Sequence, residues 1–162
     1  SSRISRGRAT SSQSSPEGYS MISTIPAHPS HLQILEMKEV YEDPDIINNC
    51  TSAMAYNNAV TFVGPKGEIL AIVGFTYIYD KCGEVWALTS KDLKQYPLAF
   101  SRRSKEMLDK FIYKNKLNRV QMVVKQGYEE GFQYALFLGF EPEGILRKYG
   151  PLGHNYVMMG KV

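Results

Sequence analysis

A short basic segment near residue 100 contains the residue types that bind phosphate. An amphipathic helical pattern begins at Phe100, and Arg102, Arg103 and Lys105 fall in its first turn. Cations there oppose the partial positive charge of a helix N-terminus, by up to about 1 kcal/mol each. A bound phosphate or pyrophosphate would offset this repulsion, since free N–H groups and guanidinium groups both bind it. An equally weighted alternative is a solvated basic face whose long side chains turn away from the helix end.

Histidines and cysteines do not add a second chemical site. His28 and His31 are three residues apart, but a proline separates them and no cysteine or carboxylate cluster accompanies them. We therefore expect no metal site. Cys50 and Cys82 are too few for a disulfide framework, which favours a reducing compartment and a protein that is not secreted.

Three aromatic residues of the strand-rich region have two interpretations. Tyr77, Tyr79 and Trp86 are residue types that stack on nucleobases. Aromatic residues in strands belong more often to the core of a sheet, and this is the interpretation that we prefer.

Length and charge restrict the class of protein further. The 162 residues correspond to one domain, and the net charge of +3 is too small to favour general nucleic-acid binding. No apolar run approaches the length of a membrane span, and no signal peptide is apparent. Residues 1–20 contain eight serines and a net charge of +2, so we expect a flexible tail, either a remnant of cloning or a basic arm for a partner.

The pattern of residues 21–162 predicts one α+β domain with a mixed sheet. Helices are expected over 29–40, with Ser30 as N-cap, over 44–56, from Phe100 to about Asn115, and over 128–138, closed by Gly139. Strands are expected over 59–63, 68–79 and 84–89 as an antiparallel meander, over 119–124, and over 140–148 and 154–159 as a C-terminal hairpin.

This order of elements resembles the GCN5-related N-acetyltransferase (GNAT) fold. The stretch from Gly131 to Gly144, in which a helix runs into a Gly-Phe pair and then a strand, is similar to the end of that family. More narrowly, the chain from His31 onward resembles the acetyltransferase-like internal virion protein A family of T7-type short-tailed bacteriophages. That likeness rests on HLQILE at 31–36, WALTS at 86–90 and the basic helix after them. It covers roughly residues 25–160 and depends on the order of the motifs.

The resemblance implies that acetyl-CoA is the cofactor and that an acetyl group is transferred to a primary amine. Strand 84–89 would splay from strand 119–124, and the pantetheine arm of acetyl-CoA would lie in the opening. The implied cofactor-binding residues are Leu88 and Thr89 for that arm, and the N–H groups of Ser101, Arg102, Arg103, Ser104 and Lys105 for the pyrophosphate. Glu84, on the strand beside the opening, is the candidate general base, and Tyr134 is the candidate general acid.

The chain departs from the family pattern at three places. Arg103 and Lys105 stand where the pyrophosphate loop of the family has small residues that allow close backbone contact. The tyrosine of the family aligns with Ala135, and Tyr134 is rotated from that position by about 100° on a helix. The asparagine that starts this helix in the family aligns with Tyr128. Side-chain cations would then have to replace the backbone contacts, or the cofactor does not bind.

Three functions are consistent with these residues. The preferred one is an acetyl-CoA-dependent N-acyltransferase that acts on a protein lysine or on a small amine. A catalytically degenerate GNAT-fold protein that binds a host or virion protein is the second, because the glycines and the tyrosine are absent. A phage inhibitor of a host defence is the third. For a phage protein, we expect location in the host cytoplasm during infection or association with the virion.

Overall fold

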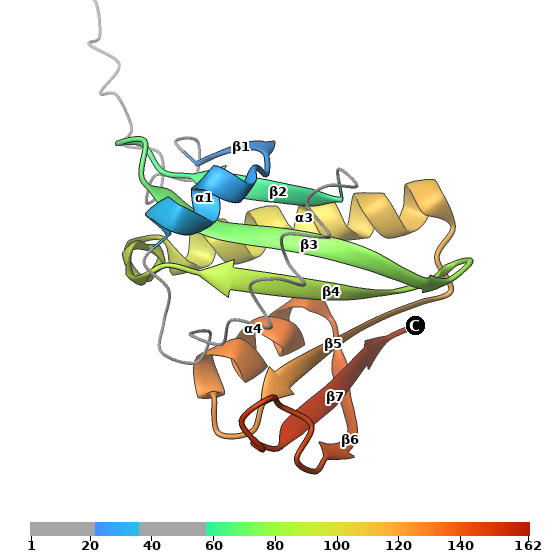
Figure 1. Ribbon diagram of the computed structural model, residues 1–162. Helices are drawn as coiled ribbons and strands as arrows, with labels where there is room; N and C mark the ends of the chain where they lie inside the picture. The colour runs from blue at the N-terminus through green and yellow to red at the C-terminus, as the bar shows by residue number, and fades with distance from the viewer. Residues whose placement is uncertain (1–21, 36–57) are drawn as a thin grey trace, which may run out of the picture.

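The computed structural model describes residues 22–35 and 58–162, which form a seven-stranded sheet with helices on both faces (Figure 1). The strand order is β1-β2-β3-β4-β5-β7-β6. Strands β4 and β5 are parallel, and every other neighbouring pair is antiparallel. The predicted mixed sheet in an α+β domain is therefore confirmed.

The predicted meander consists of β2 (Ala59–Val63), β3 (Ile69–Tyr79) and β4 (Cys82–Thr89). These segments are rich in β-branched and aromatic residues and are joined by short turns, which explains why the sequence pattern located them. The short strand β1 (Ser23–Pro26) pairs with β2 at the edge of the sheet and was not predicted. Its four residues include a proline, which strands tolerate at an edge.

The first helix begins at Pro29, the first residue of the predicted range, but its cap differs from the prediction. Helix α1 spans Pro29–Ile34, and its N-cap is His28, whose ring accepts a hydrogen bond from the Ser30 N–H at 3.1 Å. The assignment of the cap to Ser30 was therefore wrong, because Pro29 already occupies the first helical position. The helix predicted over 29–40 ends at Ile34, because Leu35 is its C-cap and has an extended backbone, so the predicted continuation through Leu35 was wrong. Residues 36–40, and all of the helix predicted over 44–56, lie outside the described residues.

The long helix begins earlier than predicted. A short 3-10 helix, η3 (Lys91–Gln95), precedes α3 (Pro97–Asn115). Proline is favoured in the first turn, and the Phe100 N–H already donates to the Tyr96 carbonyl at 3.0 Å. Phe100 therefore lies inside the helix and not at its start.

The C-terminal half agrees closely with the predicted order. Strand β5 (Arg119–Lys125) leads to α4 (Glu129–Leu138), and the hairpin of β6 (Glu141–Leu146) and β7 (Tyr156–Lys161) follows. Gly139 ends α4 in the left-handed conformation, with φ of 98°, as predicted. Strand β7 lies between β5 and β6, so β6 forms the outer edge of the sheet.

Side chains alternate between two apolar layers. On one face, Val85 and Met122 belong to a cluster with Leu108 of α3 and Leu138 of α4. On the other face, Leu88 packs with residues that include Leu35, just after α1. Because neighbouring residues of a strand point to opposite faces, β4 presents odd-numbered side chains to α3 and α4 and even-numbered ones to α1.

The exposed tip of the β3–β4 hairpin corrects one expectation. Tyr77 is 46% exposed and Tyr79 is 74% exposed, so neither belongs to the sheet core. Both lie among the last four residues of β3, all of which are exposed. In the described residues, no helix is long and apolar enough to cross a membrane.

Candidate functional site

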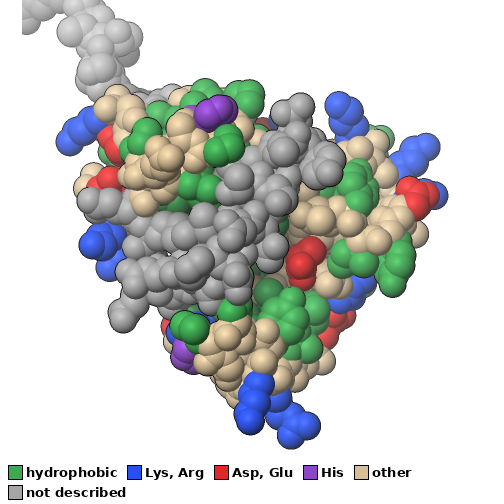
Figure 2. Space-filling model, viewed as in Figure 1, with side chains coloured by type: hydrophobic (Ala, Val, Ile, Leu, Met, Phe, Trp, Pro, Cys, Tyr) green, Lys and Arg blue, Asp and Glu red, His purple; other side chains and the backbone are tan. Residues whose placement is uncertain are grey.

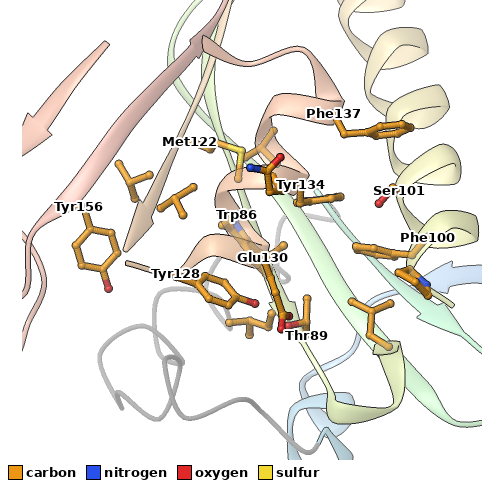
Figure 3. A pocket seen from close by; sticks show the side chains of 18 of the residues that line it. Trp86, Thr89, Phe100, Ser101, Met122, Tyr128, Glu130, Tyr134, Phe137 and Tyr156 are labelled. Atoms are coloured by element: carbon orange, nitrogen blue, oxygen red, sulfur yellow. The ribbon is translucent and has the colours of Figure 1, made fainter. Parts of the chain in front are cut away.

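A cleft opens in the sheet where β4 and β5 stop pairing. Their parallel register extends only from Cys82↔Arg119 to Glu84↔Gln121. Beyond this point the strands diverge, and the space between them has a volume of about 960 Å³ (Figure 3). The expected splay of residues 84–89 from 119–124 is therefore confirmed.

The cleft connects the two faces of the sheet. Glu84 and Trp86 line it on the α1 face, whereas Phe100 and Tyr134 line it on the α3 and α4 face. Thr89 lies at the end of β4 and also lines the cleft (Figure 3). Two ligands can thus approach the same space from opposite sides, which is the geometry that direct transfer between them requires.

The start of α3 borders the cleft and has free backbone donors. Lys94, Leu98 and Ser101 line the cleft at this end. Pro97 has no N–H, so the first donors of the helix are Leu98 and Ala99, and neither has a backbone acceptor among the described residues. The N–H groups from Ser101 onward lie within the helix, where they bond to carbonyls four residues earlier. An anion at this helix end would therefore meet the amides of Leu98 and Ala99, and not those of residues 101–105.

The predicted basic residues lie outside the cleft. Arg102 is exposed and lies one turn after Leu98 on the same side of α3, so its long side chain can extend toward the helix start. Arg103 is partly buried and does not line the cleft. Lys105 points away, because its Nζ donates to Asp109 at 2.7 Å. Lys94 lines the cleft instead.

Strand β4 supplies a second set of polar groups. Leu88 and Thr89, the residues expected to contact the pantetheine arm, both line the cleft. The edge of β4 that faces β5 has no strand partner beyond Glu84. The hydroxyl of Thr89 is buried, with only 8% of the residue exposed, and has no hydrogen-bond partner in the part of the chain that the structure describes. Such a group is costly to bury alone, and a polar ligand in the cleft would satisfy it.

Glu84 is held at the narrow end of the cleft by a chain of hydrogen bonds. Glu143 of β6 binds Arg119 through both guanidinium nitrogens, and Arg119 Nε donates to Gln121 Oε1 at 3.1 Å. Gln121 in turn hydrogen-bonds Glu84. Burial nevertheless raises the pKa of Glu84 above its ordinary value, and the Gln121 hydrogen bond only partly opposes this. A carboxylate that binds protons more readily than usual suits a general base.

Tyr134 contributes its ring to the cleft but not its hydroxyl. The ring stacks on Phe100 at 5.2 Å between centroids, and the hydroxyl oxygen is buried. Burial raises the pKa of Tyr134 far above its ordinary value. Ser104, which is itself buried, lies close enough to lower that pKa slightly, although the two hydroxyls do not form a well-directed hydrogen bond. The role of general acid expected for Tyr134 therefore stays a prediction, which the burial of its hydroxyl does not favour.

Two further tyrosines, which the sequence did not single out as ligand contacts, line the cleft on the side of the β6–β7 hairpin. The rings of Tyr149 and Tyr156 meet edge to face at 5.6 Å. Burial and the nearby charge of Glu84 both raise the pKa of Tyr149. Tyr149 and Tyr156 thus form an aromatic wall of the cleft, and the carboxylate of Glu84 lies close to Tyr149.

Comparison with known proteins bears on this architecture. No protein-family model matches the chain, and no curated protein matches it in sequence. Among solved structures, Ard1 from Thermoplasma volcanium has a TM-score of 0.71 at 10% identity, over 87% of this chain and 97% of its own. The GNAT-family acetyltransferase from Bacillus anthracis has a TM-score of 0.67 at 12% identity, over 88% and 95%. Ribosomal-protein-S5-alanine acetyltransferase from Vibrio fischeri has a TM-score of 0.62 at 16% identity, over 88% and 93%.

The protein has the GNAT fold. At these identities the similarity shows the fold alone. None of the comparisons supports the narrower resemblance to the phage virion family, which stays a prediction. The departures of this chain from the GNAT pattern can now be located, since Arg103 and Lys105 lie in regular turns of α3 where that pattern has a glycine loop.

Acetyl-CoA, which the GNAT fold implies, can be compared with the cleft part by part. The unpaired edge of β4 and the unpartnered hydroxyl of Thr89 suit the amide-rich pantetheine arm. The free amides of Leu98 and Ala99, with Lys94 beside them, suit a pyrophosphate. The residues present therefore fit this group, although the donors differ from those predicted at 101–105.

Within the described residues, no three histidine, cysteine, aspartate or glutamate side chains come together as a metal site.

Proposed function

We propose that the protein is an acetyl-CoA-dependent N-acyltransferase that acetylates a primary amine. The observation that carries this proposal is the cleft through the sheet, with free backbone donors at the α3 end and the carboxylate of Glu84 on the opposite face. Leu88 and Thr89 would hold the pantetheine arm, while Leu98, Ala99 and Lys94 would hold the pyrophosphate. Ser101 and Arg102 border the same end of the helix. When bound, acetyl-CoA supplies an acyl group already activated as a thioester.

Glu84 would remove the proton that the acceptor amine loses as it attacks the acyl carbon. Gln121, which accepts a hydrogen bond from Arg119, interacts with the carboxylate of Glu84 from the neighbouring strand. The raised pKa increases its affinity for that proton.

Structural neighbours support an amine acceptor without identifying it. One is described as an alanine acetyltransferase of ribosomal protein S5 and another as a spermidine N-acetyltransferase. A protein amine and a small polyamine are therefore both within the chemistry that this fold performs in other proteins.

Calorimetric titration with acetyl-CoA tests the donor half of the proposal. We expect binding in the micromolar range, weakened at least about tenfold, or 1.4 kcal/mol, by Lys94→Ala. Lys91→Ala is the matched control, since Lys91 lies on the same 3-10 helix but does not line the cleft. Arg102→Ala and Arg103→Ala compare the phosphate site at Leu98 and Ala99 with the one predicted at residues 101–105. Because Arg102 lies one turn after Leu98, Arg102→Ala should weaken binding at the first site more than Arg103→Ala does. No detectable binding at millimolar acetyl-CoA would refute the proposed enzyme.

A second candidate function is binding without catalysis. Two observations favour it: the regular turns of α3 replace the glycine loop, and the hydroxyl of Tyr134 is buried. Under this function the fold would present a surface to a host or virion protein, and acetyl-CoA would not bind. The proposed bacteriophage origin, and with it the location in the host cytoplasm or the virion, belongs with either function and rests on the sequence resemblance alone.

A further inference from the structure

A second, shallow hollow lies beside the cleft on the β6–β7 hairpin. Tyr149 lines the cleft, and it also lines a shallow surface hollow formed by residues 145–149, with a volume of about 600 Å³. Ile145 in this hollow is 55% exposed. Tyr149 thus belongs to both the cleft and the hollow, so the hollow lies next to the cleft on the side of the hairpin.

The hairpin turn is held firmly beside the cleft. The Lys148 N–H donates to Asn155 Oδ1 at 2.9 Å, and Asn155 Nδ2 donates to Gln126 Oε1 at 3.2 Å. Gly150 lies directly against the ring of Tyr156, where a Cβ would come within 2.5 Å of a ring carbon. These contacts tie the turn to the end of β5, so its side chains keep their place relative to Glu84.

Basic side chains gather at this turn and at the neighbouring end of β5, and we define them as the basic rim: Lys125 of β5, and Arg147 and Lys148 of the turn. Arg147 and Lys148 are exposed, and none of the three forms an ion pair with another described residue. The segment 144–162 contains no aspartate or glutamate. Figure 2 shows Lys and Arg side chains at the lower end of this face, where the hairpin lies, and acidic side chains above them.

The distribution of charge selects among acceptors. A carboxylate deep in the cleft favours an amine at that point, whereas a basic rim outside repels a polycation and attracts carboxylates. We propose that the acceptor is an acidic peptide segment of another protein, with its amine directed at Glu84 and its carboxylates at Arg147 and Lys148. This inference rests on the proposed function, because it names the acceptor of that reaction.

Peptide binding in the absence of acetyl-CoA tests the rim directly. The probes are fluorescein-labelled peptides with a free N-terminal alanine followed by a run of aspartate, asparagine or lysine, measured by fluorescence anisotropy. We expect the aspartate peptide to bind the full chain at least about tenfold more tightly than the asparagine peptide, with the difference decreasing as salt increases. The lysine peptide should bind more weakly than either.

A charge-reversed variant assigns the effect to the rim. Arg147→Glu/Lys148→Asp should abolish the preference for aspartate or invert it. Aspartate is chosen at 148 because that residue has φ of 55°, which Asp tolerates better than most residues. Lys66→Asp/Lys114→Glu is the matched control, with the same change in net charge at residues that do not line either hollow.

The outcomes separate this inference from the proposed function. Equal binding of the aspartate and asparagine peptides, or a preference that survives the charge reversal, would overturn the inference. Acetylation of a polyamine with no acetylation of the aspartate peptide would also overturn it, while the enzyme assignment would stand. Charge-dependent peptide binding without acetyl transfer would support the docking surface and count against the proposed enzyme.

Discussion

Gly74→Ala tests the packing that shapes the cleft wall. Gly74 lies opposite Trp86 in the β3–β4 register, and a Cβ built on it would lie 2.0 Å from Cζ2 and 2.3 Å from Cε2 of the indole ring. Carbon atoms in contact are normally about 3.5–4.0 Å apart, so the ring must move by about 1.5 Å or more. Since β3 blocks one side, we expect Trp86 to move toward the cleft that it lines.

The magnitude follows from two opposing effects. Overpacking a filled site costs about 1–3 kcal/mol. Alanine in place of glycine within a strand is favourable by about 0.5–1 kcal/mol. We therefore expect a net loss of about 1–2 kcal/mol, which lowers Tm by about 2–8 °C for a chain of this size.

Intrinsic fluorescence gives a specific assay, because Trp86 is the single tryptophan of the chain. In Gly74→Ala, the emission maximum and the quenching by acrylamide should both change, and Tm should fall. Gly144→Ala is the matched control, since a Cβ there would have no neighbour within 4 Å. If Gly74→Ala has wild-type fluorescence and a Tm within about 1 °C of wild type, the ring does not rest on Gly74 and this account of the cleft wall is refuted.

Three further predictions concern the reaction and the fold. Glu84→Gln should lower kcat by about 10²–10⁴-fold in a thiol-release assay, whereas the control Glu141→Gln should leave kcat unchanged. In the wild type, kcat/KM should rise with pH through a pKa above the ordinary glutamate value, because the ionised form of Glu84 is the base. A wild-type rate in Glu84→Gln would remove its role. Tyr134→Phe should keep kcat within about threefold of wild type, since the hydroxyl is buried, and a loss of two orders of magnitude would show that it reaches the thiolate. Lys161→Met should lower the free energy of unfolding in urea by about 1–2 kcal/mol, because Lys161 Nζ donates to the Leu138 carbonyl at 2.6 Å and to Asp109 at 2.8 Å.

The same lysine makes stability depend on pH. Partial burial alone would raise the pKa of Asp109, but its hydrogen bonds and ion pairs with Lys105 and Lys161 outweigh this and hold it below the ordinary value. A carboxyl group whose pKa is lowered on folding stabilises the folded state at pH values above its pKa in the unfolded chain, which is about 3.9 for aspartate. This stabilisation is lost as the pH falls through the pKa that the group has in the folded protein. Urea unfolding at neutral and acid pH should therefore show a smaller acid loss in Lys161→Met than in wild type, and an identical loss would contradict the role of the pair.

The sequence alone determined most of the element order. Glycine, proline and alternating apolar residues located the meander, and Gly139 identified the end of α4, because these signals act within a few residues. The splay of β4 from β5 and the place of Glu84 beside the opening followed from the resemblance to the GNAT fold.

Only the tertiary structure decided which groups face the cleft. Proline at position 97 allowed α3 to start earlier, which moved the free amides from 101–105 to Leu98 and Ala99. Lys105 has the charge expected of a phosphate ligand, yet it pairs with Asp109. Tyr149 and Lys94 gave no sequence signal, and they reach the cleft because a hairpin and a 3-10 helix from distant parts of the chain fold against it. Residue type and local spacing determine which elements form, whereas the direction of a side chain and its partner depend on the packing of those elements against one another.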